Sequence, residues 1–336
     1  MPIFSEDPRI DSWAQRHLAC PRDFKPFEIL ADRLRCPQNH TYPIVEGVPI
    51  LLIAEIVPTQ KQFWKVPEQL VNSLKLHGEN PTDPHGVDPF VKQAIRATSG
   101  NLYDPAAKNL RRYPIPELRL PKANGGYFLD LGCNWGRWCL SAARKGYLPV
   151  GIDPNLEAVL AARRISRQLK IPACFLVADA RHLPFTSSCM DVVFSYSVLQ
   201  HFDKEDARQA FKETSRALKT GGTAFIEMPN AFGLHNLLHQ LKRGFRQARD
   251  FEVRYWTPAE LGRAFSSSIG PTRLFADGYF SLNPQMADLD LLPFAYRLVV
   301  RISEWLRKRS LAWPGLVYFA DSLYVKSTAS SKKTSC

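Results

Sequence analysis

The chain has 336 residues, of which 45% are hydrophobic and 23% charged, with a formal net charge of +12. That length suits one large α/β domain with a smaller module. The seven cysteines are scattered along the chain, which argues against a disulfide framework. No run reaches the roughly 18 apolar residues that a membrane span needs. The basic excess is spread thinly, with twelve Lys and Arg against seven Asp and Glu in the most basic stretch, 231–310, so we expect no dominant nucleic-acid-binding patch. The odd number of scattered cysteines and the polar amino-terminal sequence predict a cytoplasmic protein.

Residues 15–54 form the first module that the sequence sets apart. Its run YPIVEGVPILL predicts a short hairpin with its turn at Glu46-Gly47. The module carries two pairs of potential metal ligands that are separated by a short interval. This is the layout of a zinc ribbon, in which each pair lies on its own turn. The candidate metal ligands are Cys20, Asp23, Cys36 and His40. Either this ribbon binds a structural zinc, or it has kept its hairpin without an ion and is held by apolar residues, namely Leu18, Ile44, Val48 and Leu51.

The rest of the chain alternates strand-like and helical patterns. Residues 55–125 are rich in proline and predict a connector with a few helices, and 126–327 predict a doubly wound, seven-stranded, Rossmann-like α/β domain. The expected strands are 127–132, 148–153, 173–179, 190–197, 222–229, 272–280 and 316–327. The expected helices between the first five strands are 136–146, 155–169 and 203–219, with Gly221-Gly222 as the stop after the last helix. The tail, 328–336, has a disordered composition.

Two insertions, 230–256 and 281–315, interrupt this domain and predict basic amphipathic helices that cap the acceptor site. Each insertion spaces apolar residues on one helical face. These are Leu234, Leu237, Leu238, Leu241 and Phe245 in the first, and Phe294, Leu298, Ile302 and Trp305 in the second. Such helices can lie on an anionic membrane or bind phosphate groups. The more common arrangement, which we expect here, packs the apolar stripe into the core.

The segment FLDLGCNWGRW carries the most specific signal for function. A strand ends at Asp130, a tight loop contains Gly132 and Gly136, and a helix follows at once. Ligands of doubly wound sheets bind at this edge, where glycine allows close approach of the backbone. A dinucleotide fingerprint would need a third glycine, and Asp130 would repel a pyrophosphate. An acidic group here suits a ligand with an ammonium and a sulfonium, so the electrostatics favour S-adenosylmethionine.

Two further strands also end in aspartate. Asp153 is placed to accept the ribose hydroxyls of a nucleoside, and Asp179 to accept its adenine amino group. A single aspartate at a strand end is often only a helix cap or a turn residue. Three of them at the spacing of βαβ units indicate one binding site.

This region resembles a class I S-adenosylmethionine-dependent methyltransferase. DLGCNWG is similar to the D-x-G-x-G-x-G loop of that family, GID to its ribose strand and VADARHLPF to its adenine strand, and the match covers about 100–230. Asn134 stands where the family usually has its central glycine, and asparagine tolerates the left-handed conformation better than most residues. The cofactor-binding residues that the resemblance implies are Asp130, Gly132, Cys133, Asn134, Gly136, Asp153, Pro154, Asp179, Ala180 and Ser195.

The amino-terminal module resembles two zinc ribbons of methylation systems. One belongs to the guanine-N1 ribosomal-RNA methyltransferases, and the other is the small activator of tRNA methyltransferases. The second ligand of those ribbons is a cysteine, whereas this chain has Asp23. The resemblance implies structural zinc as a second bound group.

The residues after the fourth strand bear on the methyl acceptor. The N/D-P-P-Y/F motif of enzymes that methylate exocyclic amines is absent, since Ser195-Tyr196-Ser197-Val198 stands in its place. Tyr196 and His201 are candidate catalytic groups, and His201 would serve as a base or only pack at a helix start. We expect a small-molecule acceptor or one linked to a lipid or a sugar. Peripheral contact with an anionic membrane is the alternative that the basic amphipathic helices leave open. The alternatives are an RNA methyltransferase, which the slightly acidic ribbon disfavours, and a non-catalytic member that binds the cofactor or a partner.

Overall fold

A computed structural model describes residues 3–56, 86–99, 110–280 and 285–330. The chain divides into two compact units. The first comprises Met1–Val91 and Arg111–Asp191, and the second comprises Lys92–Leu110 and Val192–Cys336. Among the described residues, no helix combines the length and the apolar character that crossing a bilayer requires. Parts of the expected connector and tail, at 57–85, 100–109 and 331–336, lie outside the described residues, as do residues 281–284 of the second insertion.

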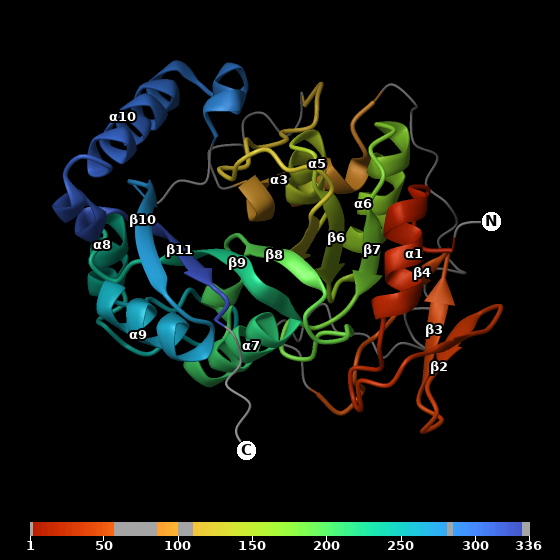
Figure 1. Ribbon diagram of the computed structural model, residues 1–336. Helices are drawn as coiled ribbons and strands as arrows, with labels where there is room; N and C mark the ends of the chain where they lie inside the picture. The colour runs from red at the N-terminus through yellow and green to blue at the C-terminus, as the bar shows by residue number, and fades with distance from the viewer. Residues whose placement is uncertain (1–2, 57–85, 100–109, 281–284, 331–336) are drawn as a thin grey trace. The chain divides into compact units, whose positions relative to one another are not determined.

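The first unit begins with helix α1 (Pro8–His17) and a small antiparallel sheet. The strands of this sheet are β1 (Glu28–Ile29), β2 (Arg33–Arg35), β3 (Thr41–Val45) and β4 (Val48–Pro49). The hairpin prediction is confirmed, because Glu46 and Gly47 both have positive φ, 48° and 73°, between β3 and β4. The chain then runs alongside β7, where the amide of Leu51 donates to the carbonyl of Val177 at 2.7 Å. Figure 1 shows α1 and β4 beside β7.

The parallel part of the first unit carries two βα turns. Its strands are β5 (Tyr127–Leu131), β6 (Leu148–Asp153) and β7 (Cys174–Val177), and its helices are α5 (Arg137–Arg144) and α6 (Leu156–Gln168). Every residue of β6 and β7 is buried, as expected for parallel strands covered on both faces. The carboxyl ends of β5 and β6 meet at one edge, because Leu131 pairs with Ile152 in parallel register.

The second unit carries the antiparallel part. Its strands are β8 (Met190–Ser195, which begins in the first unit), β9 (Leu218–Pro229), β10 (Thr272–Gly278) and β11 (Ser322–Thr328). Strand β11 pairs antiparallel with both β9 and β10. The strand order of the whole sheet is β10-β11-β9-β8-β5-β6-β7. This seven-stranded mixed sheet with helical connections confirms the doubly wound, Rossmann-like α/β fold.

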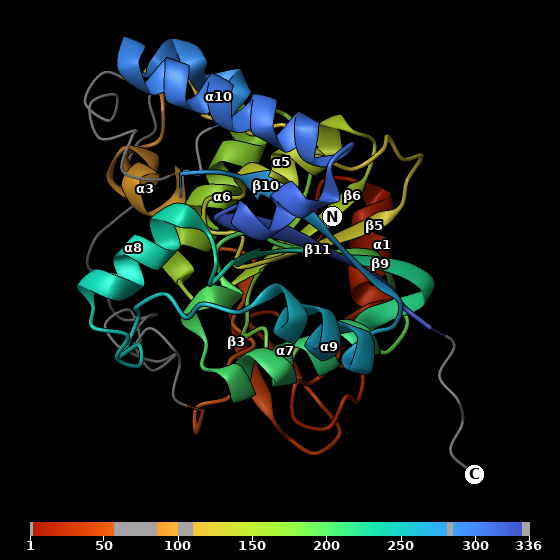
Figure 2. The same ribbon diagram turned by 90° about the vertical axis from the view of Figure 1, so that its left-hand side faces the viewer.

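Helices fill the connections and both insertions. They are α3 (Pro89–Ser99), η3 (Leu199–His201), α7 (Lys204–Ala217), α8 (Leu234–Lys242), α9 (Pro258–Ser268), η4 (Met286–Leu291), α10 (Phe294–Ser310) and η5 (Pro314–Phe319). Figure 2 turns α8 and α10 toward the viewer. The predicted helices of the insertions are present, and α9 packs on β10 and β11.

The carboxyl-terminal part differs from three expectations. Helix α7 stops at Ala217, and β9 starts at Leu218 and runs through the two glycines, because their backbone pairs with the end of the chain: Gly221 donates to Ala329, and Ala329 donates to Gly222. The expected strand at 316–327 starts only at Ser322, after a 3₁₀ helix. Residues 328–330, which we assigned to a disordered tail, are ordered by these bonds and by one from Ser330 to Ile269.

Candidate functional site

The loop between β5 and α5 has the backbone that a close-fitting ligand site needs. Gly132, Asn134 and Gly136 all adopt left-handed conformations, with φ of 72°, 46° and 81°. The asparagine therefore takes the place of the expected glycine, as predicted. The amides of Gly132 and Cys133 both donate to the carbonyl of Ile152 at 2.8 Å, which fixes the loop to the end of β6.

Asp130 is the last but one residue of β5, and it is only 1% exposed. The thiol of Cys139 donates to its Oδ2 at 3.5 Å, and burial raises the pKa of Asp130 to about 7. A carboxylate that is removed from water in this way gains most from a cationic partner. The donor set therefore fits a ligand that carries an ammonium or a sulfonium.

Asp153 is the last residue of β6, and its carboxylate binds the loop that follows the neighbouring strand β5. Its Oδ2 accepts the amide of Asn134 at 3.0 Å and its Oδ1 accepts the amide of Asn155 at 2.9 Å. Burial raises its pKa to about 6, and the two amide bonds act in the opposite direction. Each carboxylate oxygen keeps a second lone pair for a ribose hydroxyl. Pro154 follows half-buried, before Asn155 caps α6.

Asp179 follows β7 and is already paired within the protein. Its carboxylate accepts the backbone amide of Arg181 at 2.8 Å and forms an ion pair with the guanidinium of Arg181, with Nη2 at 2.6 Å from Oδ2. Ala180, which stands between these two residues in the sequence, is buried. Sequence reasoning placed Asp179 opposite an adenine but did not foresee that Arg181 shares the carboxylate.

Three of the predicted site residues, Ser195, Tyr196 and His201, lie in the second unit. Ser195 is fully buried at the end of β8. The hydroxyl of Tyr196 donates to Oδ2 of Asp277 at 2.7 Å, and burial together with that carboxylate raises the pKa of Tyr196 well above its usual value of 10. The Tyr196 proton is thus held firmly at neutral pH, which does not suit a general base.

His201 ends the short helix η3 and stacks on Phe251, with ring centroids 3.7 Å apart. Its Nδ1 lies 2.8 Å from the carbonyl oxygen of Phe251, so Nδ1 carries the proton and donates it. Its Nε2 then accepts from the side-chain amide of Gln200 at 3.2 Å. Burial lowers the pKa of His201 to about 4, so the ring is neutral at pH 7. These contacts suit the packing role that we left open for this residue.

A buried carboxyl network in the second unit escaped sequence reasoning. Glu227 on β9 accepts the amide of Ser197 at 2.7 Å and the hydroxyl of Ser322 at 2.5 Å, and Ser322 also lies 3.1 Å from Asp277. Burial raises the pKa of Glu227 to about 7, and the neighbouring Asp277 adds to this. The available signal was a single acidic residue inside the apolar strand sequence TAFIEMP.

The structure brings the four candidate metal ligands of the ribbon together. All four ligand atoms lie within 4.8 Å of one another. The Sγ of Cys36 is 3.3 Å from both Nδ1 of His40 and Oδ2 of Asp23, and Sγ of Cys20 is 3.5 Å from Nδ1 of His40. In a tetrahedral zinc site, ligand atoms are about 3.6 Å apart, since Zn–S bonds are ~2.3 Å and Zn–N or Zn–O bonds ~2.1 Å. The donor set and its spacing therefore fit zinc, with Asp23 in the place of a cysteine.

Comparisons with known proteins agree with the geometry at the strand ends. Residues 128–222 match a family described as a methyltransferase domain. A ubiquinone biosynthesis O-methyltransferase of Brucella ovis is 30% identical over 202 residues, which span 57% of this chain and 72% of that protein. A tRNA U34 carboxymethyltransferase of Campylobacter curvus is 30% identical over 115 residues, or 33% of this chain and 36% of that protein.

Among solved structures, a complex of the Haloferax volcanii Trm112 methyltransferase activator with a putative methyltransferase aligns with a TM-score of 0.45 and 21% identity, covering 71% of this chain and 94% of that chain. The likeness to the Brucella protein reaches 30% identity and extends over 72% of that protein's length. The chain therefore belongs to the class I S-adenosylmethionine-dependent methyltransferases.

Proposed function

We propose that the protein transfers the methyl group of S-adenosylmethionine to a hydroxyl group of a small-molecule or lipid-linked acceptor. The observation that carries this proposal is the buried carboxyl of Asp130 beside a left-handed glycine loop, joined to a relative that is named as a ubiquinone biosynthesis O-methyltransferase. The bound cofactor supplies an electrophilic methyl group on a sulfonium. The protein's own contribution is to orient the reactants, which can supply much of the rate of an in-line displacement.

Each strand-end carboxylate has a proposed role toward the cofactor. Asp130 balances the positive charge of the amino-acid part, and Asp153 accepts the ribose hydroxyls while holding Asn134 and Asn155 by their amides. Asp179 accepts the adenine amino group and shares its charge with Arg181. The other proposed contacts come from Gly132, Cys133, Asn134, Gly136, Pro154, Ala180 and Ser195.

Calorimetry with S-adenosylhomocysteine tests the cofactor site. Asp153→Ala should weaken binding about 100-fold, because two hydrogen bonds to the ligand and the support of the loop are lost, roughly 3 kcal/mol together. Asp203→Ala is the matched control: it removes the aspartate that caps α7 and should leave the affinity unchanged. Unchanged affinity in Asp153→Ala, or tight binding of NAD instead, contradicts the proposal.

The acceptor class is tested by transfer of a labelled methyl group into fractionated cell extract. We expect label in the lipid-extractable or small-molecule fraction, resistant to nuclease. The tRNA-modifying relative keeps RNA as the alternative, although residues 1–54 hold seven acidic against six basic residues. Binding of an RNA acceptor would weaken steeply as the salt concentration rises, whereas binding of a small neutral acceptor would change little. Cofactor binding without label in any fraction would indicate the non-catalytic alternative.

We also propose that the ribbon binds one structural zinc ion through Cys20, Asp23, Cys36 and His40. Elemental analysis of the purified protein should find one zinc per chain, and Cys36→Ser should weaken zinc binding more than 100-fold, since a structural site of ~10–16 kcal/mol is shared by four ligands. Asp23→Cys should tighten it. Cys189→Ser, at a buried cysteine outside this cluster, is the control, and zinc-free protein with an equally stable ribbon would refute the site.

A further inference from the structure

The exposed apolar side chains of the described residues are concentrated in one region. Of the nineteen large hydrophobic residues that are exposed, all but Phe24 and Ile29 lie within 232–319, so seventeen belong to this single stretch of the second unit. Isolated exposed apolar residues are normal on protein surfaces, but a concentration of this kind marks an interaction surface.

Helix α8 turns its polar side toward the core, whereas its sequence predicts that the leucine side packs there. Its stripe of four leucines is exposed, with Leu241 at 61%, and its buried residue is Asn236. The amide of Asn236 donates to Oδ1 of Asp321 at 2.9 Å, and its side chain donates to the carbonyls of Asn230 and Asp321. Polar bonds thus fix the orientation of α8 and turn the leucines outward. The expectation that this stripe packs into the core is wrong.

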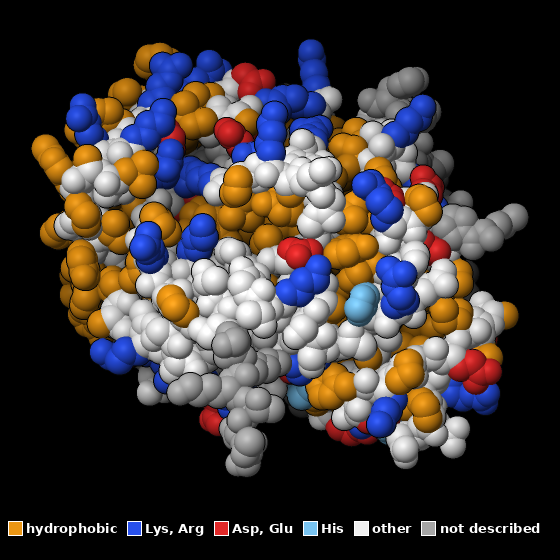
Figure 3. Space-filling model, viewed as in Figure 1, with side chains coloured by type: hydrophobic (Ala, Val, Ile, Leu, Met, Phe, Trp, Pro, Cys, Tyr) orange, Lys and Arg blue, Asp and Glu red, His pale blue; other side chains and the backbone are white. Residues whose placement is uncertain are grey.

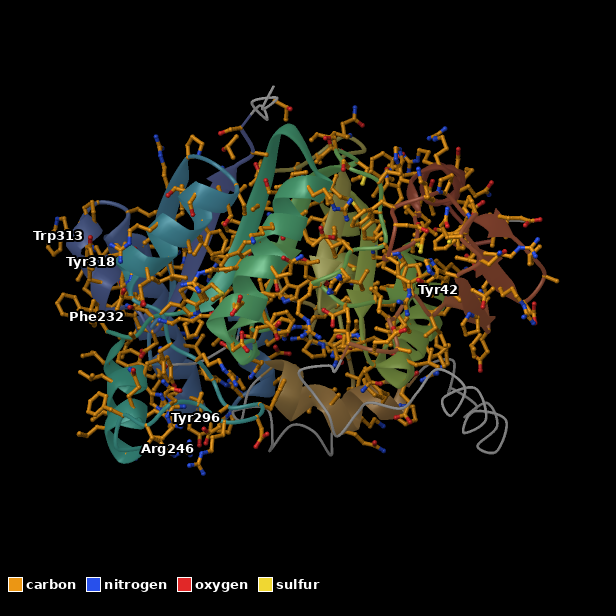
Figure 4. The ribbon with its side chains drawn as sticks, turned by 90° about the horizontal axis from the view of Figure 1, so that it is seen from below. Tyr42, Phe232, Arg246, Tyr296, Trp313 and Tyr318 are labelled. Carbon is orange, nitrogen blue, oxygen red and sulfur yellow. The ribbon has the colours of Figure 1, made fainter. Side chains whose placement is uncertain are left out.

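Helix α10 and the segment that follows it continue the same exposed surface. Phe294 is 82% exposed, and Leu298, Ile302 and Trp305 follow it along one face, while Val300 and Ser310 are buried. After the helix, four more exposed apolar side chains come from Leu311, Trp313, Tyr318 and Phe319. In Figure 4, Trp313, Tyr318 and Phe232 lie along one edge of the structure. We call these exposed residues of 232–319 the apolar face.

Cations flank this apolar face. Helix α10 carries five Lys or Arg against the single Glu304, which is bonded to Arg307 and lies 3.9 Å from Lys308. The guanidinium of Arg309 lies over the ring of Trp305, 5.5 Å from its centroid. Figure 3 shows hydrophobic and basic side chains intermingled over the region of α10. The surface therefore combines apolar and aromatic contact with a surplus of positive charge.

We propose that the apolar face of α8, α10 and η5 docks on the surface of an anionic phospholipid bilayer. Tryptophan and tyrosine favour the level of the headgroups, and Lys and Arg beside them attract anionic lipids. Two copies that paired through this face would bring the basic α10 helices together, so charge complementarity favours lipid over a second copy. The proposal concerns partner binding and stands whether or not the acceptor is lipid-linked.

Flotation of the full-length protein with vesicles tests the proposal. The vesicles contain phosphatidylcholine alone or with about one third phosphatidylglycerol, an anionic lipid. The wild type should bind the anionic vesicles and lose much of this binding at high salt, because the cations are exposed and screened. The triple variant Leu298→Gln/Trp305→Gln/Trp313→Gln should bind at least ~100-fold more weakly, since three apolar side chains no longer enter the interface.

The matched control is Phe24→Gln/Ile29→Gln, which replaces the two exposed apolar residues outside the apolar face and should keep full vesicle binding. All three proteins should show the same thermal transition and the same affinity for S-adenosylhomocysteine, so that a folding defect is recognised. Equal binding of the triple variant, or equal binding of the wild type to neutral vesicles, overturns the proposal. So does a dimer that the triple variant dissociates while neither protein binds vesicles.

Discussion

Helix α5 of the first unit and helix α8 of the second are both amphipathic, but their leucines lie in opposite environments. Leu140 of α5 is fully buried, whereas Leu241 of α8 is 61% exposed. The difference does not come from the helices themselves, because both form where the residue spacing predicts them. It comes from their surroundings, since α5 packs against β5 and β6, while α8 is held through the polar contacts of Asn236. Periodicity thus identifies a face, and tertiary contacts decide which way that face points.

The largest expected effect is on the pH dependence of the free energy of unfolding, to which one buried carboxyl group in each unit contributes. Burial raises the pKa of Asp130 from 3.8, and that of Glu227 from 4.5, to about 7. Because the folded protein binds these protons more tightly than the unfolded chain does, their stabilising contribution is complete below about pH 4 and is lost as the pH rises to about 7. For Asp130 this amounts to roughly 4 kcal/mol.

Asp130→Asn and Glu227→Gln should each flatten the fall in the free energy of unfolding between pH 4 and pH 7, measured by urea denaturation without cofactor. Only Asp130→Asn should also weaken binding of S-adenosylhomocysteine, and it should remove the rise of affinity with pH that deprotonation of the Asp130 carboxyl gives the wild type. If Glu227→Gln weakened the affinity as much, the assignment of the cofactor site to the first unit's carboxylates would fail.

The next effect tests the two amphipathic helices directly. Leu140→Ala should lower the free energy of unfolding by about 2–5 kcal/mol, because it leaves a cavity in the core. Leu241→Ala should change it by less than about 0.5 kcal/mol, since this side chain is exposed. Denaturant titration of the two variants measures both values. A loss above 2 kcal/mol in Leu241→Ala would mean that the leucine stripe is covered.

Helix caps should show where the two units do not differ. Asn155 caps α6 by accepting two backbone amides, and Thr257 caps α9 in a reciprocal arrangement with Glu260. Replacing either cap by alanine should cost about 1 kcal/mol in thermal or chemical unfolding. Clearly unequal costs would show that local chemistry, and not only burial, separates the two units.

The smallest effect concerns His201. Since both ring nitrogens are hydrogen-bonded and the ring stacks on Phe251, His201→Gln should lower the methyl-transfer rate less than about 10-fold. A general base would contribute 10²–10⁴-fold. A fall in kcat in that range, with an unchanged thermal transition, would restore His201 as the base.

The sequence could specify the cofactor loop because its signals are local. A left-handed turn needs Gly132, Asn134 or Gly136 whatever surrounds it, and parallel strands place their terminal aspartates at one edge. The pairing of Asp179 with Arg181 was less accessible: two residues apart, they can meet or diverge according to the backbone between them. The network of Glu227, Asp277 and Ser322 was out of reach, because it joins three strands distant in the sequence.

By itself, then, the sequence determined the class of fold, the ribbon hairpin and the strand-end carboxylates, since spacing and backbone preference act over a few residues. Only the tertiary structure decided that the ligand atoms of Cys20, Asp23, Cys36 and His40 lie within reach of a single ion, and that the leucines of α8 face outward. Both outcomes depend on contacts between distant segments. An apolar stripe has the same periodicity whether a core, a partner or a membrane covers it.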